Sequence, residues 1–243
     1  MIKNTVTART LLGGLATVLI TGAVCLAGVA PAMAASTNSA THTPRTLADI
    51  QASGATATSQ RIASLQKAIP KITGNKCIAD SDRSTILGTL SADLSGMQSL
   101  SAKIAADTDM KTAAADYRSI FDGYRVYAIG LSQAHYAAAA DCITNKGLPA
   151  LIAAQTKLTA ALAGPDSSKS TPAIQASMTD LAAQIAAAQS ATNGLAAAAL
   201  ATTPAEFNAN SSVLAPTKLA VSTAVAAVRA GQQDAKSVVT ALR

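Results

Sequence analysis

From residue 46 to the C-terminus, apolar side chains recur every three or four residues, and proline, glycine or asparagine interrupts this pattern at intervals. Such spacing places the apolar side chains on one face of an α-helix. No stretch alternates apolar and polar residues between hairpin turns, as a half-buried strand would. Alanine occupies 58 of the 243 positions, which favours helices and lets them approach closely. The pattern predicts an all-α fold, an antiparallel bundle of five to six helices in one domain over residues 46–243.

Helix-breaking residues set the expected helix ends. Pro70 should end the first helix, and the Asn-Lys-Gly run at 145–147 should end the third. The expected helices cover residues 46–69, 79–106, 110–144, 149–164, 172–201 and 214–242. Residues 202–213 are expected to form a connector. The third helix carries five of the six aromatic residues, and a stripe along it from Tyr117 to Cys142 predicts one continuous helix.

The N-terminal segment has the three parts of a secretory signal peptide. Lys3 and Arg9 precede an apolar, uncharged run over residues 11–29, and Ala-Met-Ala at 32–34 fits a signal peptidase site. The run is long enough for a permanent membrane anchor, but the cleavage motif directly after it favours a signal peptide over residues 1–34. Residues 35–45 are small and polar and should form a flexible linker.

The charge of the chain is mildly basic. Nineteen Lys and Arg stand against thirteen Asp and Glu, and cleavage after Ala34 leaves the mature chain at +4. This charge suits a protein partner or an anionic polymer of the cell envelope, or peripheral contact with lipid headgroups, but it is too small to indicate nucleic-acid binding. We expect a secreted or envelope-associated protein.

Two cysteines remain after cleavage, Cys77 and Cys142. If the helices over 79–106 and 110–144 fold back at residues 107–109, both cysteines lie near the open end of one long helical hairpin and face inward. The compartment is oxidising. The sequence therefore predicts a disulfide that braces the hairpin, and the absence of a Cys-x-x-Cys motif argues against a redox or metal pair.

The composition excludes several kinds of active site. Glu206 is the only glutamate and there are two histidines, too few for a zincin or a two-glutamate glycosidase. Ser64 and Lys67 match Ser-x-x-Lys, but its partner motifs Ser-Asp-Asn and Lys-Thr-Gly do not occur. His135 lies on the aromatic stripe, where a packed histidine is the ordinary case. We expect no catalytic, cofactor or metal site.

The segment 116–127 admits two interpretations. Arg118 and Asp122 are four residues apart, and Asp122 and Arg125 are three apart, which suits ion pairs along a helix. The ordinary interpretation is a solvated ladder of charges beside a tyrosine core. The other is a binding face, because Tyr and Arg are favoured at interface hot spots. Tyr127 and Tyr136 lie off the stripe and complete this candidate face.

Five segments carry a resemblance to a known group of proteins. They are 104–110 (Ile-Ala-Ala-Asp-Thr-Asp-Met), 116–121 (Asp-Tyr-Arg-Ser-Ile-Phe), 124–127 (Tyr-Arg-Val-Tyr), 204–210 (Pro-Ala-Glu-Phe-Asn-Ala-Asn) and 213–216 (Val-Leu-Ala-Pro). Over residues 57–242 the chain resembles an uncharacterised family of exported, alanine-rich helical proteins of actinobacteria. The resemblance implies an envelope setting and no particular activity. The cysteine pair departs from the mostly cysteine-free pattern of that family.

The leading functional expectation is an exported, non-enzymatic helical protein that acts as a structural or interaction module of the cell envelope. The alternative is a membrane-active or lipid-binding bundle of the co-haemolysin kind, since alanine-rich amphipathic helices with a mild positive charge permit it.

Overall fold

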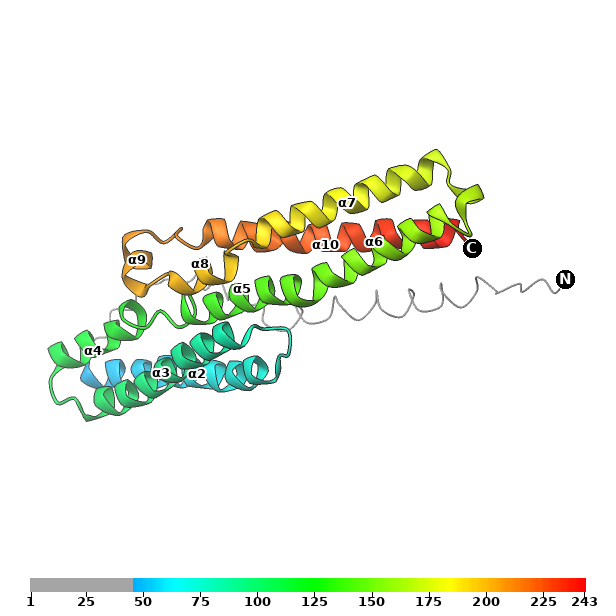
Figure 1. Ribbon diagram of the computed structural model, residues 1–243. Helices are drawn as coiled ribbons and strands as arrows, with labels where there is room; N and C mark the ends of the chain where they lie inside the picture. The colour runs from blue at the N-terminus through cyan, green and yellow to red at the C-terminus, as the bar shows by residue number, and fades with distance from the viewer. Residues whose placement is uncertain (1–45) are drawn as a thin grey trace. The chain divides into compact units, whose positions relative to one another are not determined.

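The structure, a computed structural model, describes residues 46–243, and all regular secondary structure in that range is helical (Figure 1). The prediction of an all-α fold is confirmed. The expected signal peptide (1–34) and linker (35–45) lie outside the described residues.

The described residues form two compact units. The first comprises residues 46–138 and 196–218, and we call it the aromatic unit because it holds all six aromatic residues. The second comprises residues 139–195 and 219–243, and we call it the aliphatic unit. Each is described separately below.

The aromatic unit is built around two long helices and the shorter segments that pack on them. Its helices are α2 (Leu47–Gly74), α3 (Asp80–Ala106), α4 (Met110–Asp122), most of α5 (Gly130–Cys142), α8 (Leu195–Ala201) beyond its first residue, and α9 (Pro204–Ala209).

The helices α2 and α3 pack antiparallel. Near the start of α2, Gln51 Nε2 donates to the carbonyl of Ala105 at the end of α3, at 3.1 Å. One turn further on, Gly54 faces Ile104, and a Cβ at position 54 would lie 2.8 Å from Ile104 Cγ2. Glycine is therefore required at position 54 for this close approach.

The core of the aromatic unit consists of aliphatic side chains, with the aromatic rings at its margin. Tyr117, Phe121, Tyr124 and Tyr136 are only partly buried and pack against it. The largest fully buried side chains are Leu65, Ile86, Leu90, Met97, Ile104, Ile120 and Val126. Burying such a side chain contributes about 1.5–3 kcal/mol to folding, and burying an alanine methyl about 0.8 kcal/mol, so these few positions carry much of the stability.

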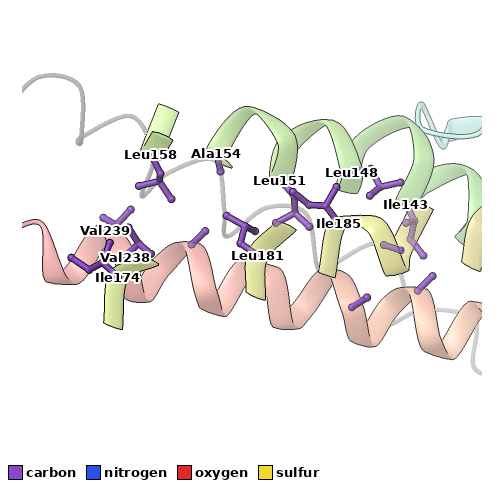
Figure 2. Close-up of a cluster of buried hydrophobic side chains, with 14 of the residues drawn as sticks. Ile143, Leu148, Leu151, Ala154, Leu158, Ile174, Leu181, Ile185, Val238 and Val239 are labelled. Atoms are coloured by element: carbon purple, nitrogen blue, oxygen red, sulfur yellow. The ribbon is translucent and has the colours of Figure 1, made fainter. Parts of the chain in front are cut away.

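The aliphatic unit is formed by α6 (Leu148–Ala163), α7 (Pro172–Thr192) and most of α10 (Ala215–Ala241). A Cβ at Gly231 of α10 would lie 3.2 Å from Leu151 of α6 and 3.4 Å from Leu181 of α7, so the three helices approach closely there. Figure 2 shows their aliphatic side chains pointing toward one another. The labelled residues are Ile143, Leu148, Leu151, Ala154 and Leu158, Ile174, Leu181 and Ile185, and Val238 and Val239.

The prediction of one continuous helix over residues 110–144 is wrong. The helix α4 ends at Asp122, residues 123–129 form a turn, and α5 begins at Gly130. The turn buries Val126 and Ile129 completely or nearly so, at 0% and 2% exposure. In a continuous helix both residues would lie off the stripe from Tyr117 to Cys142 and would not face the core. Interrupting the helix allows both side chains to be buried, and this burial favours the turn over a regular helix.

Two expected helix ends are also wrong. Pro70 lies inside α2, which continues to Gly74, and Ile72 in that last turn is buried against the core. The run at 145–147 does not stop the chain either, because residues Ile143–Gly147 form a π-helical turn that leads directly into α6. Residues five apart do not share a face in an α-helix, but the wider π turn brings Ile143 and Leu148 into one core.

The expected helix over 172–201 is interrupted as well. It ends at Thr192, and Gly194, with φ +65°, separates α7 from α8. The expected connector over 202–213 contains α9, which begins with a capping box between Thr203 and Glu206. The expected start of α7 at residue 172 is confirmed, and the Thr171 side chain caps it by accepting from the N–H of Ile174.

The predicted disulfide is present. Cys77 and Cys142 are both disulfide-bonded, and they are joined to each other.

Candidate interaction surface at the α4–α5 turn

The turn between α4 and α5 is held in one conformation by Arg125. This residue has φ +47°, the only positive φ among the non-glycine residues that the structure describes. Such a backbone is unfavourable for a side chain with a Cβ and must be held by its surroundings. Arg125 Nε donates to Asn208 Oδ1 at 2.7 Å, and Nη2 pairs with Asp122 Oδ1 at 3.3 Å.

The short helix α9 completes this arrangement from a distant part of the chain. Asn208 Nδ2 donates to the carbonyl of Asp122 at 2.9 Å, and the Arg125 guanidinium lies 5.2 Å from the centre of the Phe207 ring. The capping box fixes the start of α9, and the Thr203 N–H and hydroxyl that bind the Glu206 carboxylate lower the pKa of that carboxyl. A segment about 80 residues further along the chain therefore shapes the turn.

Tyr127, at the far side of the turn, is held against α2. The Arg61 guanidinium carbon lies 4.7 Å from the centre of the Phe121 ring and 4.9 Å from that of Tyr127. The Tyr127 hydroxyl lies 3.1 Å from Ser64 Oγ. With 37% of its surface exposed, Tyr127 is one of the few large side chains of the described region that face solvent. The exposed ring is thus fixed by two contacts.

The Ser64 hydroxyl is engaged in helix structure. Its Oγ donates to the carbonyl of Gln60 at 2.9 Å, so the Tyr127 hydroxyl donates to Ser64. Lys67 is exposed and makes no hydrogen bond with Ser64. The geometry therefore places no lysine base at the Ser64 hydroxyl, and the hydroxyl proton is donated to the carbonyl of Gln60.

The other members of the predicted face differ in position. Asp122 is exposed and pairs with Arg125 as predicted, whereas Arg118 is exposed and makes no ion pair with any described residue. Tyr136 lies on α5 and packs against the core, with its ring 5.5 Å from that of His135. Burial raises the pKa of the Tyr136 phenol. Arg125, Asp122 and Tyr127 are therefore brought together by the turn, and Tyr136 belongs to the core margin.

Polar groups outside the turn have structural surroundings. Burial lowers the pKa of His135, which keeps its ring neutral near pH 7. Lys103 pairs with Asp116 at 2.8 Å, and burial together with the neighbouring Asp116 carboxyl raises the pKa of Asp107. Burial also raises the pKa of Asp93 to about 6.

Two kinds of feature are absent from residues 46–243. No group of three or more His, Cys, Asp or Glu side chains is placed to hold a metal ion. No helix in this range has the length and apolar character to cross a bilayer.

Sequence reasoning missed three residues of this surface, namely Arg61, Phe207 and Asn208. Arg61 stands four positions before the buried Leu65, and a cation beside a core stripe was a signal that could have marked it. Nothing in the local sequence pairs Asn208 with Arg125, because their contact depends on the fold.

Comparison with known proteins adds no relative. No protein-family model matches the chain, and no curated protein sequence and no solved structure is detectably similar to it.

Proposed function

We propose that this protein is an exported, non-enzymatic interaction module of the cell envelope that binds a protein partner through the α4–α5 turn. We call this surface the turn face, and it comprises Asp122, Arg125 and Tyr127, with Arg118 beside them on α4. The resemblance to exported helical proteins of actinobacteria supports the same setting.

One observation carries the proposal. Arg125 and Tyr127, two residue types favoured at interface hot spots, are exposed or half-exposed and already fixed by contacts with α2, α4 and α9. A side chain that is fixed before binding loses little conformational entropy when the partner arrives. The positive φ of Arg125 fits this interpretation, since strained backbone is concentrated at functional sites.

A pull-down from envelope extract of the host tests the proposal. Mature protein is compared with the Arg125→Ala, Tyr127→Ala double variant, and partners are quantified by mass spectrometry. An Arg229→Ala variant is the matched control, because Arg229 is exposed on α10 in the aliphatic unit. We expect the double variant to lose the partners that the control retains. Equal recovery by all three proteins would remove the turn face from the proposal.

The lipid-binding alternative calls for a different experiment. Four large apolar side chains are exposed in the described region, and they are Met110, Tyr127, Ile152 and Leu219. A few exposed apolar side chains are common on protein surfaces. Flotation with anionic vesicles tests the alternative directly, and co-flotation of the mature protein would favour it over the interaction module.

A further inference from the structure

Arg61 differs from the other half-buried arginines that the structure describes. Arg83 pairs with Asp80 at 2.5 Å, and Arg125 pairs with Asp122 at 3.3 Å. Arg61 makes no ion pair with a described carboxylate, although burial desolvates its guanidinium enough to lower its pKa. A desolvated charge without a counter-ion is costly, and the two neighbouring rings compensate only part of that cost.

The hydrogen-bond donors of Arg61 are only partly used. Nη1 donates to the carbonyl of Ala57 at 2.9 Å. Nε is buried and has no acceptor, and Nη2 has no protein acceptor and is not among the buried atoms, which leaves it at the surface. Because Nε has no accessible surface, a group from outside the protein can reach Nη2 only. A charged carboxylate oxygen is a strong acceptor for this N–H.

The acidic side chains of the neighbouring helix are turned to other partners. On α4, Asp122 binds Arg125 and Asp116 binds Lys103. No carboxylate of the described residues forms an ion pair with Arg61.

We propose that Arg61, framed by Phe121 and Tyr127, binds one carboxylate side chain of a protein partner. This proposal rests on the proposed function and names the chemistry of its ligand. The incoming carboxylate gives Nη2 the acceptor that it lacks, and the exposed Tyr127 ring packs against the apolar neighbours of that carboxylate.

A protein carboxylate fits better than a polyanionic polymer. Polymers are bound by many distributed cations whose contributions add. Here a single guanidinium lies 4.7 Å and 4.9 Å from the centres of two aromatic rings, an environment that suits one charge within an otherwise apolar contact. The partner should thus present one glutamate or aspartate flanked by apolar side chains.

The experiment is a titration of the mature protein followed through arginine Nε–Hε resonances in two-dimensional ¹H–¹⁵N NMR. The probes are the blocked tripeptide Leu-Glu-Leu, its Leu-Gln-Leu counterpart and inorganic phosphate, at constant ionic strength. The Arg61 resonance is assigned by its absence in Arg61→Lys. The Arg125 resonance is the internal control, because its Nε already donates to Asn208.

We expect the glutamate peptide to shift the Arg61 resonance saturably, with an affinity at least about tenfold above that of the glutamine peptide, as for loss of one charged hydrogen-bond partner. The Arg125 resonance should stay in place. Equal effects of the two peptides, or no shift of Arg61, would overturn the proposal. Tighter binding of phosphate than of the glutamate peptide would also overturn it, in favour of a phosphate-bearing polymer.

If Arg61→Lys does not fold, through-bond correlation of the Nε–Hε group with the Arg61 backbone assigns the resonance in the wild-type protein. The outcome is also separable from the proposed function. If the titration fails while the Arg125→Ala, Tyr127→Ala variant still loses its partners, only the carboxylate inference falls.

Discussion

The Tyr124 ring lies directly over Gly96, and a Cβ at position 96 would stand 2.2 Å from Tyr124 Cε1. The missing side chain on α3 therefore creates the space in which the first residues of the turn dock. Gly96→Ala should displace the ring and lower the free energy of unfolding by about 1–3 kcal/mol, the usual cost of overpacking. Urea unfolding followed by circular dichroism measures this change.

Gly88 on the same helix provides the matched control. Apart from its chain neighbours and the backbone of its own helix, no described atom lies within 4 Å of a Cβ built at position 88. Gly88→Ala should therefore stabilise α3 by about 0.5–1 kcal/mol through helix propensity alone. Opposite signs for the two glycines are expected, and a stabilising Gly96→Ala would show that the ring adapts without cost.

Asp93 should make stability depend on pH. Burial raises the pKa of its carboxyl to about 6 in the folded protein, above the usual value near 3.8, and Oδ2 has no hydrogen-bond partner among the described residues. At a pH between these two pKa values, Asp93 is ionised in the unfolded chain but protonated in the folded protein. The free energy of unfolding therefore falls as the pH rises from about 4 to about 6. Above pH 6 the loss is complete and constant.

Asp93→Asn removes this ionisation without changing the size of the side chain. The size of the side chain is important because it lies close to the Gly130 backbone: a Cβ built at position 130 would lie 2.6 Å from Asp93 Oδ2. The variant should unfold at a higher urea concentration than wild type at pH 7.5, and the difference should shrink toward pH 4. A difference that does not change with pH would contradict ionisation of Asp93 as the cause.

The helical class could be predicted because three- and four-residue spacing is local information. The disulfide was predicted from an expected hairpin with a fold-back at residues 107–109, and the bond is present although the second arm of that hairpin is broken at residues 123–129. The helix α3 was expected over 79–106 and lies over Asp80–Ala106, where strong spacing and a clear break at 107–109 agree.

The interruptions of the helices could not be predicted because tertiary contacts decide them. The aromatic stripe continues through residues 123–129 in the sequence, but burial of Val126 and Ile129 favours a turn. Residues 145–147 read as a stop, but the buried Ile143 and Leu148 on either side favour a π turn. In both places a local signal competes with the core, and the core prevails.

The same limit applies to the candidate site. The pair of Asp122 and Arg125 is local, and its spacing revealed it. The contacts of Arg125 with Asn208 and of Tyr127 with Ser64 join residues 83 and 63 positions apart, and spacing carries no information about them.

Removing the disulfide should destabilise the protein. In the chain-entropy account, a cross-link between residues as distant as Cys77 and Cys142 contributes about 4 kcal/mol by restricting the unfolded chain, and measured losses are typically 2–5 kcal/mol. The double variant Cys77→Ser, Cys142→Ser should therefore unfold at a clearly lower urea concentration than wild type. A reducing agent should shift wild type in the same direction and leave the double variant unchanged, and an unshifted wild type would argue against this contribution.

Asn208 should control how firmly the turn face is held. Asn208→Ala removes the acceptor of Arg125 Nε and the donor to the Asp122 carbonyl, so the two hydrogen bonds of the Asn208 side chain are lost at once while the Arg125–Phe207 contact remains. Each surface hydrogen bond contributes about 0.5–1.5 kcal/mol. When amide exchange follows the equilibrium of local opening, a loss of about 1 kcal/mol confined to the turn corresponds to roughly fivefold faster exchange of its amides.

The amide of Ile129 is the direct reporter, because it donates to the carbonyl of Arg125 at 2.7 Å. Its hydrogen exchange, measured by NMR, should accelerate in Asn208→Ala and stay unchanged in Asn210→Ala. Asn210 is the matched control at the end of the same short helix, since its side chain accepts only from the nearby Ser212 N–H. Exchange at Gln175 in the aliphatic unit should be the same in all three proteins. If Asn210→Ala accelerated Ile129 as much as Asn208→Ala did, general loosening of α9, rather than the Asn208–Arg125 contact, would explain the effect.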